Sequence, residues 1–581
     1  MKIAIKTIKF IIRVLPKQQK LKLIGVGILL LVNSLLELLG LGALIPVFSV
    51  LLEDDVIAKY EWAQWVSNVF GFTDERQLIM ALAIGLLLVI IVKNILTLWI
   101  AKLNSTFALS LYKDFAIRLH KYYYQLGFSY FKSNNSNLVV RNLRLATNYF
   151  SNLQVLGTLN LINEIIVLLL ILIFMALYNI QILGLLFITV VPPFFLFYRW
   201  VRLRSIRLGN IKNNVEPILG QHFFQSIFGY VDVVVTGSEK VFRKKIEKNL
   251  DELVQVDIKT NIYNLAPTRL IESSLMFAIV TIISFGVYYL PSKIELLKLL
   301  GLFAVAGYRI MPSINRMMIS INGLNRCHWI FDVLKPLESI ESDTKNIKTE
   351  DLNFSRSLHL ENISFSYPES AELIFKDYSL EIMKGEVIGF VGPSGAGKTT
   401  LMNIMLGFLK PTAGNYKVDD IPLSEQYYKS FYEKVGYVQQ QVYLLDGSLA
   451  ENVAFGCDAE DIDINKVKHV LDKASLLKTV MDFPEGINEM IGENGTKLSG
   501  GQRQRVGIAR ALYFDAEILF FDEATSALDT ETEQEITEAI RKLSDGNLTM
   551  IIIAHRLSTL EYCDRIIEVN YQAIPEKIAN E

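Results

Sequence analysis

Apolar residues are concentrated in the first part of the chain. Runs of about 20 of them, the length that crosses a bilayer, recur between residues 21 and 325, and none follows residue 330. They cover residues 23–52, 78–101, 156–178, 182–200, 263–290 and 296–321. The pattern predicts six membrane-spanning helices followed by a soluble domain.

Two long polar tracts separate some of these spans. Helical periodicity continues into residues 102–130 and 205–260, and sequences typical of turns occur near residues 133–143 and 229–242. We expect the helices to extend well past the membrane and to reverse direction at these turns. Both tracts are rich in Lys and Arg, so the positive-inside bias places them, and both chain ends, in the cytoplasm.

The first 20 residues form a separate amphipathic segment. Lys2, Lys6, Lys9 and Arg13 recur at helical spacing between isoleucines, which predicts a helix lying on the membrane surface. A signal peptide is the competing interpretation, but charges interrupt the apolar stretch and no small-residue cleavage site follows. Residues 61–72 form another short apolar stripe, whose tryptophans suit a membrane interface.

Three ionisable side chains inside the spans are candidates for contact with a transported substrate. Glu37 lies about 20 Å into the first span, where it either faces the bundle or a wet cavity, or is protonated and hydrogen-bonded to a neighbouring helix. Arg269 and Arg309 fall in the cytoplasmic halves of their spans and would suit an anionic headgroup. The alternative is local, in that each arginine extends to the interface or pairs nearby, as Arg269 would with Glu272.

Composition narrows the remaining possibilities. The mean hydropathy of +0.31, with 51% hydrophobic and 20% charged residues, fits a membrane part and a soluble part in one chain. The formal net charge of −2 indicates no nucleic-acid partner. Three cysteines without CxxC or Cys/His spacing indicate neither a disulfide framework nor a zinc site. We divide the chain into an interfacial helix (1–20), a transmembrane domain (21–325), a polar linker (326–357) and a soluble domain (358–581).

The soluble domain contains a glycine-rich phosphate-binding motif. Residues 392–400 read GPSGAGKTT, between an apolar strand pattern at 387–391 and an apolar helical pattern at 401–406. In such a unit the glycines turn backbone N–H groups toward one anion, the lysine reaches the β- and γ-phosphates, and the next hydroxyl binds Mg²⁺. The predicted phosphate-binding residues, with Thr399 also at the metal, are Gly392, Pro393, Ser394, Gly395, Ala396, Gly397, Lys398, Thr399 and Thr400.

Three further motifs follow in the same domain. LSGGQ occupies residues 498–502, EILFFDEATSALD occupies 517–529 and IIIAHR occupies 551–556. Together with GPSGAGKT they resemble the nucleotide-binding domain of ATP-binding cassette (ABC) transporters over about residues 335–570, and the six-span part resembles the exporter type of that family. The resemblance implies an α-helical membrane domain plus an α/β P-loop domain, with ATP and Mg²⁺ as cofactors and ATP hydrolysis coupled to transport.

The same resemblance implies roles for individual residues. Asp522 would hold Mg²⁺ and Glu523 would act on the attacking water. Gln440 would sense and bind the metal, and His555 would contact the γ-phosphate. The usual family pattern has a proline before this glutamine, and the triple glutamine at 439–441 leaves the assignment open by one position.

The LSGGQ segment implies a second copy of the chain. Ser499, Gly500 and Gly501, at a helix start, would form another anion cradle with Gln502 beside it, and in the family this segment closes over ATP bound to the other subunit. Because the chain has one copy of each motif, we expect a homodimer with two shared sites. Tyr367 would stack on the adenine ring, although a lone tyrosine in a strand is more often part of a core.

Within the family, the membrane part most resembles flippases for lipid-linked oligosaccharides. The resemblance depends on ELLGLGALIPVF in the first span, the tryptophan stripe, PTRLIES in the fifth span and GYRIMPSINR in the sixth. We therefore expect flipping of a polyprenyl-diphosphate-linked oligosaccharide across the bacterial cytoplasmic membrane by alternating access. Export of drugs, other lipids or peptides by the same architecture is the alternative.

Overall fold

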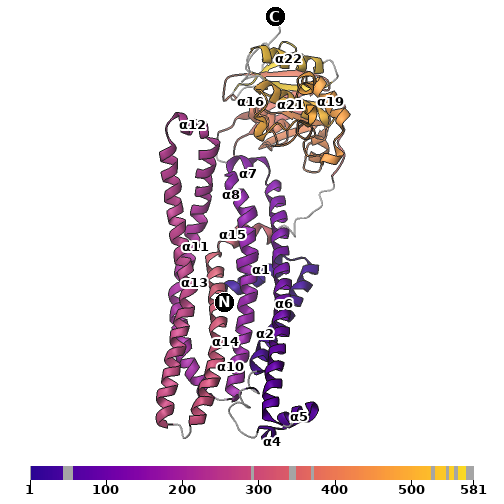
Figure 1. The fold of residues 1–581 in the computed structure, drawn as a ribbon. Coiled ribbons are helices and arrows are strands. Elements are labelled where there is room, and N and C mark those ends of the chain that lie inside the picture. Colours follow the sequence, from indigo (N-terminus) through magenta and orange to yellow (C-terminus); the bar gives the residue numbers. More distant parts are fainter. Residues whose placement is uncertain are drawn as a thin grey trace. The chain divides into compact units, whose positions relative to one another are not determined.

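The computed structural model describes residues 2–43, 47, 56–72, 74–178, 180–289, 293–338, 349–367, 372–524, 530–544, 548–554 and 560–570. The chain divides into two compact units, Met1–Asp343 and Thr344–Glu581. The first unit is helical and the second combines strands and helices (Figure 1). Each unit is a separate fold and is described by itself.

Long helices that lie alongside one another make up most of the first unit (Figure 1). They are α2 (Lys17–Gly42), α6 (Glu75–Gln125), α10 (Leu156–Tyr178), α11 (Ile180–Phe228), α13 (Glu239–Tyr289) and α14 (Lys293–Arg326). Each overlaps one of the six expected spans. Within the described residues, four segments, 17–40, 76–125, 136–177 and 239–284, are long and apolar enough to cross a membrane. Residues 44–46 and 48–52 of the expected first span lie outside the described residues.

Three of these helices are much longer than a membrane is thick. Helices α6, α11 and α13 contain 51, 49 and 51 residues, which corresponds to about 75 Å at 1.5 Å per residue. The chain reverses around α7 (Gly127–Ser133) and α8 (Ser136–Arg141), and again at α12 (Tyr230–Val235). Helices α8 and α12 fall in the expected turn regions, whereas the first reversal already begins at α7, ahead of residue 133. Helices α7 and α12 lie at the same end of the unit (Figure 1). Between α8 and α10 the chain stays helical through η1 (Asn142–Ala146), α9 (Thr147–Tyr149) and η2 (Phe150–Val155).

The opposite end of the helical unit carries two short helices, α4 (Val56–Lys59) and α5 (Glu61–Phe70) (Figure 1). Helix α5 buries Ala63 and leaves Trp65 and Phe70 about two-thirds exposed, at 66% and 67%. This arrangement agrees with the expected interfacial stripe, because the exposed aromatic side chains are on the surface of the helix.

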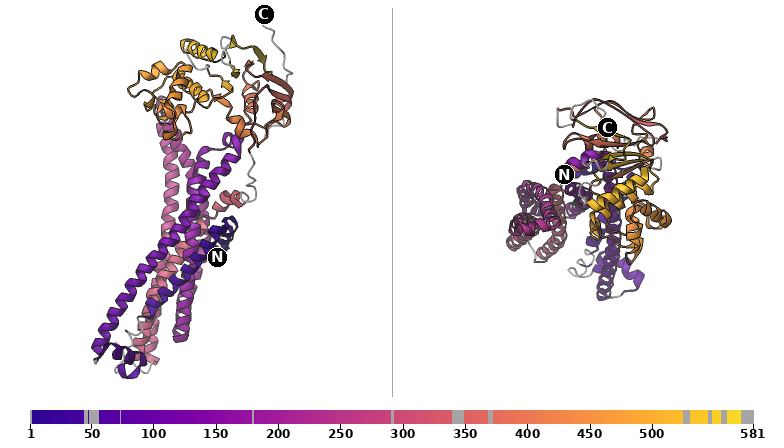
Figure 2. Two further views of the ribbon diagram at one scale, coloured as in Figure 1. Left: turned by 90° about the vertical axis from the view of Figure 1, so that its right-hand side faces the viewer. Right: turned by 90° about the horizontal axis from the view of Figure 1, so that it is seen from above.

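The N-terminal helix α1 (Lys2–Val14) is amphipathic, as the sequence predicts. Its four cations are exposed, while Phe10 is buried and meets Phe115, Phe150 and Phe331 edge-on, with ring centroids 6.3, 5.4 and 5.7 Å away. The chain starts partway along the long helices (Figures 1 and 2). Aromatic side chains of α6, η2 and α15 cover much of the apolar face of α1, and the position of the helix along the membrane surface stays a prediction.

The expected linker is shorter in the structure than residues 326–357. Helices α15 (Ile330–Leu334) and η3 (Lys335–Glu338) pack in the helical unit, where Leu334 and Leu337 are fully buried. At the other end, Leu352 and Phe354 are buried in the second unit. Apolar side chains at both ends of the polar stretch explain the difference. Residues 339–348 lie outside the described residues.

The second unit contains two sheets. The antiparallel sheet has the order β2-β1-β4-β5 and the parallel sheet the order β6-β7-β8-β3-β9. The strands are β1 (Ser357–Phe365), β2 (Phe375–Met383), β3 (Val387–Val391), β4 (Ala413–Val418), β5 (Ile421–Pro422), β6 (Val435–Val438), β7 (Ile518–Asp522), β8 (Thr549–Ile553) and β9 (Arg565–Glu568). Every residue of β7 and β8 is buried, as expected for a parallel sheet covered on both faces.

Helices surround this parallel sheet. They are α16 (Lys398–Met405), α17 (Tyr428–Tyr432), α18 (Leu449–Val453), α19 (Ile464–Lys473), α20 (Leu477–Met481), α21 (Gly500–Tyr513) and α22 (Thr530–Ser544), with short 3₁₀ turns at η4 (Ala459–Asp461), η5 (Gly486–Asn488) and η6 (Glu493–Gly495). Because β3, β6, β7 and β8 run parallel, their carboxyl ends meet at one edge. In such sheets ligands bind outside the carboxyl ends, so this edge is where the predicted site is expected.

Candidate functional site

The loop of residues 392–400 joins the carboxyl end of β3 to the start of α16. Gly392 and Gly397 have φ of 147° and 98°. A Cβ atom would lie 2.4 Å from the Val569 carbonyl oxygen at the first position and 2.9 Å from Phe375 Cζ at the second. Glycine is therefore required at both positions, by its dihedral angle and by the space available.

Lys398 is the first residue of α16, and its side chain turns back over the loop. Its Nζ donates hydrogen bonds to the carbonyl oxygens of Gly392, at 2.7 Å, and Pro393, at 3.1 Å. The residue is only 5% exposed. The loop itself thus holds the ammonium group next to the backbone N–H groups at the start of α16, where an anion is favoured.

Two hydroxyl groups follow in the first turn of α16. Thr399 is exposed, as a metal-binding hydroxyl needs to be, whereas Thr400 is buried. The Tyr367 hydroxyl lies 3.3 Å from Thr400 Oγ1, and the Tyr367 ring packs edge-on against Phe365 with centroids 5.1 Å apart. Tyr367 therefore lies beside the phosphate loop, although β1 and α16 are separated in the sequence.

Asp522 ends β7 at the same edge of the sheet. It is 8% exposed, and the Tyr437 hydroxyl donates a hydrogen bond to its Oδ2 at 3.3 Å. Burial raises the pKa of Asp522, and the Glu523 charge also raises it, whereas the Tyr437 hydrogen bond and the Lys398 charge lower it. An ionised carboxylate here is costly without a cation close by.

Glu523 directly follows Asp522, just past the carboxyl end of β7. It has φ 49°, in the left-handed region, and its N–H donates to the Ile553 carbonyl at 3.0 Å. Gln440 Nε2 donates to Glu523 Oε2 at 2.9 Å. This contact selects Gln440 from the glutamine triple as the one that meets the proposed catalytic carboxylate.

Two supporting residues were not identified from the sequence. Gln504 of α21 donates to the carbonyl oxygens of Gln440, at 2.6 Å, and Gln439, at 3.4 Å, which fixes the glutamine loop. Tyr437 bonds to Asp522 as described above. The only sequence signal for Tyr437 was a hydroxyl-bearing side chain in an otherwise apolar strand pattern, and Gln504 had none, because its partner lies in a distant segment.

The LSGGQ segment begins α21. The Ser499 hydroxyl accepts from the Gln502 N–H at 3.2 Å, and Gln502 Oε1 accepts from the Ser499 N–H at 2.8 Å. This capping box leaves Gly500 and Gly501 in the first turn of the helix. In the part of the chain that the structure describes, the recorded hydrogen bonds of Ser499 and Gln502 stay within this turn and do not reach the phosphate loop. His555, the predicted γ-phosphate contact, lies outside the described residues.

Comparison with known proteins identifies this unit. Residues 375–526 match the family model for the ABC transporter. The chain contains an ABC transporter ATPase domain. The segment that decides this assignment includes the phosphate loop, the glutamine loop, LSGGQ, Asp522 and Glu523.

Several relatives of the chain are named "ATP-dependent lipid A-core flippase". One from Ralstonia nicotianae is 37% identical over 276 residues, 47% of this chain and 45% of the relative. Another from Dechloromonas aromatica is 32% identical over 376 residues, 63% of each. The chain thus spans about half to two-thirds of the length of these curated relatives.

The fold of the whole chain is similar to that of a solved exporter. The structure described as "a bacterial Atm1-family ABC exporter with ATP bound" superposes with a TM-score of 0.74, at 20% identity, over 96% of this chain and 95% of that one. At this identity the likeness shows the fold alone. It supports the expected architecture of an apolar helical domain followed by an α/β ATPase domain.

The ATPase domain offers donors that fit Mg²⁺. The Thr399 hydroxyl and the Asp522 carboxylate are hard oxygen ligands, and Mg²⁺ is usually held by one or two carboxylates together with substrate phosphates. The raised pKa of the buried Asp522 is a second argument, since a dication nearby would stabilise the ionised form. Gln440 can supply a further amide oxygen at the same edge.

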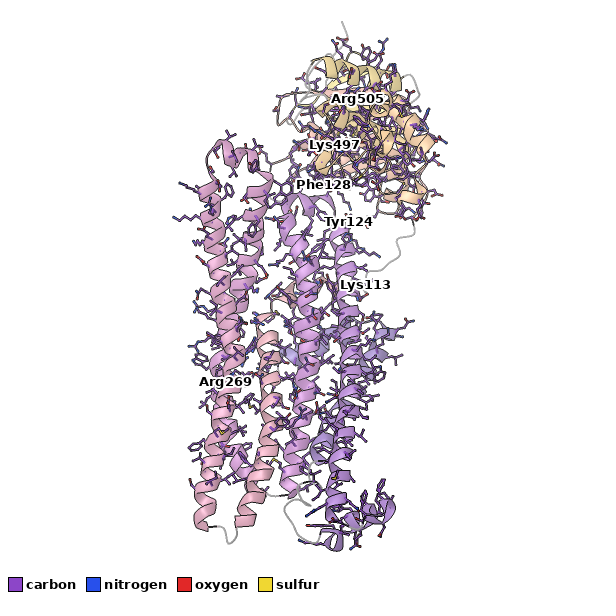
Figure 3. The ribbon with its side chains drawn as sticks, viewed as in Figure 1. Lys113, Tyr124, Phe128, Arg269, Lys497 and Arg505 are labelled. Carbon is purple, nitrogen blue, oxygen red and sulfur yellow. The ribbon has the colours of Figure 1, made fainter. Side chains whose placement is uncertain are left out.

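The candidate substrate residues of the helical unit have two different kinds of surroundings. Arg269 lies on α13 (Figure 3), is 79% exposed in its side chain, and pairs with Glu272 at 2.9 Å. The local alternative raised from the sequence therefore holds for Arg269. Arg309 is 12% exposed and pairs with Glu37, Nη2 to Oε1, at 3.1 Å. Glu37 thus faces the bundle, and the two arginines have different surroundings.

Lys93 also contacts the pair formed by Glu37 and Arg309. Its Nζ lies 2.7 Å from Glu37 Oε2, so Glu37 stands between two cations. The sequence placed Lys93 inside the second span but assigned it no role, because its partner is on another helix.

Proposed function

We propose that two copies of this chain form an ATP-driven flippase for an anionic, lipid-linked substrate, most specifically a polyprenyl-diphosphate-linked oligosaccharide. The helical unit spans the cytoplasmic membrane, with the ATPase domain and both termini on the cytoplasmic side. ATP hydrolysis drives alternating access of the membrane domain. A multidrug, lipid or peptide exporter with the same architecture is the alternative.

The ATPase site supports hydrolysis through residues with separate tasks. Lys398 and the N–H groups of the phosphate loop bind the β- and γ-phosphates. Thr399 and Asp522 would hold Mg²⁺, which would neutralise charge on the phosphates. Glu523 orients the attacking water and accepts its proton, and Gln440 positions Glu523 through the 2.9 Å hydrogen bond.

The second chain completes each site. Its Ser499 caps its own helix and leaves the Gly500 and Gly501 N–H groups at the helix start, a favourable position for a phosphate. ATP held between the loop of one chain and the LSGGQ of the other favours a closed dimer. Hydrolysis removes the γ-phosphate contacts, and the long helices with their turns at α7, α8 and α12 transmit the change to the membrane.

The observation that carries the substrate class is the buried ion cluster of the helical unit. Lys93 and Arg309 share one carboxylate, Glu37, so the cluster has an excess of positive charge inside an apolar bundle. Such intramembrane charges are costly and usually mark a substrate path. The names of the relatives support a lipid as the cargo.

A flipping assay in proteoliposomes tests the proposal. With a diphosphate-linked glycolipid as the probe, Arg309→Ala is expected to lower flipping at least about tenfold, since it removes a charge partner for the headgroup. Glu523→Gln is expected to lower both ATPase and flipping by about 100-fold or more, because the general base is lost. Arg269→Ala, at the exposed local pair, is the matched control and should have the smaller effect.

Two outcomes of the flipping and ATPase assays would contradict the proposal. Normal flipping by Arg309→Ala, together with equal handling of a neutral lipid, would favour the alternative exporter. ATPase activity that survives in Glu523→Gln would refute the assigned chemistry.

A further inference from the structure

Glu37, Lys93 and Arg309 form a cluster in which three helices meet. Glu37 is on α2, Lys93 on α6 and Arg309 on α14, and their side chains are only 10%, 19% and 12% exposed. Gly40, one turn after Glu37, lies against Lys93, since a Cβ there would be 3.2 Å from Lys93 Cδ. The glycine therefore leaves room for the lysine to reach the carboxylate of α2.

The cluster is not fully satisfied in charge or in hydrogen bonding. Two cations face one carboxylate, so one positive charge is in excess. Within the described residues, Arg309 Nε is buried without a hydrogen-bond partner, whereas Arg309 Nη2 and Glu37 Oε2 lie 3.1 and 2.7 Å from their ionic partners. Buried donors of this kind cost free energy until an acceptor reaches them.

A neighbouring ion pair in the same bundle shows what a satisfied arrangement is like. Arg316 of α14 donates from Nε to Glu164 Oε1 at 2.7 Å and from Nη2 to Glu164 Oε2 at 3.4 Å. One cation there meets one carboxylate through two hydrogen bonds, as expected for a structural pair. The Glu37 cluster lacks both the charge balance and this geometry.

We propose that Glu37 is a resident counter-anion that the anionic headgroup of the substrate displaces from Lys93 and Arg309. This proposal rests on the proposed function and adds a mechanism of selectivity to it. In the absence of the headgroup, the Glu37 carboxylate neutralises one of the two positive charges. A diphosphate offers several oxygens to both cations and to the unpartnered Arg309 Nε, whereas a neutral lipid offers no charge to replace Glu37.

Glu37 thereby favours polyanionic headgroups over weaker ligands. An anion displaces Glu37 only if its interaction free energy with Lys93 and Arg309 is more favourable than that of the ion pairs that Glu37 makes with them. Release of Glu37 also separates α2 from α6 and α14 at this level, so loading of the site changes the contacts between these helices.

The wild-type full-length protein in nanodiscs provides the first test. A hydrophobic carbodiimide modifies buried carboxyl groups that have lost their ion pairs, and mass spectrometry reports the modified residue. Farnesyl diphosphate is the anionic probe, and farnesol, with the same tail and no charge, is the control. We expect farnesyl diphosphate, and not farnesol, to raise modification of Glu37 severalfold, while modification of Glu164 stays constant.

The affinity of a variant provides the second test. In Glu37→Gln the competing charge is absent, so we expect it to bind farnesyl diphosphate at least about tenfold more tightly than the wild type by calorimetry. Glu272→Gln, which removes a carboxylate paired with the exposed Arg269, should bind as the wild type does. If Glu37→Gln fails to fold, the carbodiimide result on the wild type decides.

The outcomes separate the two proposals. If the wild type prefers farnesyl diphosphate to farnesol, but modification of Glu37 and the affinity of Glu37→Gln do not change, displacement is overturned and the proposed function stands. Binding that appears only in Glu37→Gln supports displacement. If neither protein prefers the diphosphate, the anionic substrate class and the displacement are both overturned.

Discussion

The environment of Asp522 bears on when the proposed Mg²⁺ site could hold its metal. Burial raises the pKa of this carboxyl group, so without a cation the folded domain keeps the Asp522 proton up to a higher pH than a free carboxyl group would. Protonated Asp522 therefore adds to the free energy of unfolding at low pH, and this contribution is lost as the pH rises through the raised pKa. The proposed Mg²⁺ site uses the ionised form, so protons compete with the metal as the pH falls toward that pKa. The Tyr437 hydroxyl lowers the pKa through its hydrogen bond to Oδ2.

Removing that hydroxyl tests the coupling between protonation and metal binding. In Tyr437→Phe the pKa of Asp522 should rise further, so the acid limb of the ATPase pH–rate profile should move to higher pH. We also expect Mg²⁺ affinity to fall by about tenfold, as is usual when a partner of a metal ligand is removed. A profile with an unchanged acid limb would show that Asp522 does not control this step.

At the scale of elements, the long helices pack closely at specific glycines. Gly209 of α11 faces the backbone of α14, where a Cβ atom would lie 2.0 Å from the Arg326 carbonyl oxygen. Gly220, on the same helix, has nothing within 4 Å of an added Cβ. The α11–α14 crossing therefore depends on one glycine, because a backbone carbonyl cannot move aside as a flexible side chain can.

Alanine substitution at these two glycines separates packing from helix propensity. Gly209→Ala should destabilise the helical unit by about 1–3 kcal/mol, because the two backbones must separate. Gly220→Ala should leave it unchanged or stabilise it by up to about 1 kcal/mol, since alanine favours the helix. Apparent melting temperatures of the two purified variants provide the comparison. Equal melting temperatures would contradict the close crossing.

At the scale of the molecule, the proposed homodimer assigns two parts of each ATPase domain to different ATP sites. The phosphate loop and Glu523 belong to one half-site, and the LSGGQ segment at the start of α21 belongs to the other. In a homodimer, each complete site takes one half from each chain. Two chains with different defects could therefore restore one complete site in the proposed homodimer, which is impossible if each site lies within one chain.

Mixed dimers of two inactive variants test this arrangement. Lys398→Ala removes the phosphate contact of one half-site and Ser499→Ala alters the other, so each homodimer has two defective sites. A dimer with one chain of each kind, isolated through two different affinity tags, has one intact site and one doubly defective site. We expect it to recover up to about half of the wild-type ATPase activity if the two sites act independently. Mixed dimers that stay inactive would contradict sites shared between chains.

The sequence predicted features that depend on local spacing. The six long helices, the turns near residues 133–143 and 229–242, and the strand–loop–helix unit around Lys398 all agree with expectation, because apolar periodicity and glycine positions are visible over short windows. The amphipathic helix at the start was also predicted. Its surroundings were not, since a helical pattern does not distinguish lipid from aromatic side chains of other helices.

The sequence by itself thus determined the architecture and the type of chemistry, whereas the tertiary structure decided which side chains meet. Gln440 became the partner of Glu523 only through the approach of two loops at the sheet edge. Glu37, Lys93 and Arg309 were visible as separate charges in apolar runs, but their shared cluster depends on how α2, α6 and α14 pack. Apolar periodicity in a short stretch of sequence shows which face of one helix is buried. A contact between two helices also depends on how the second helix packs, and no single stretch of sequence contains that information.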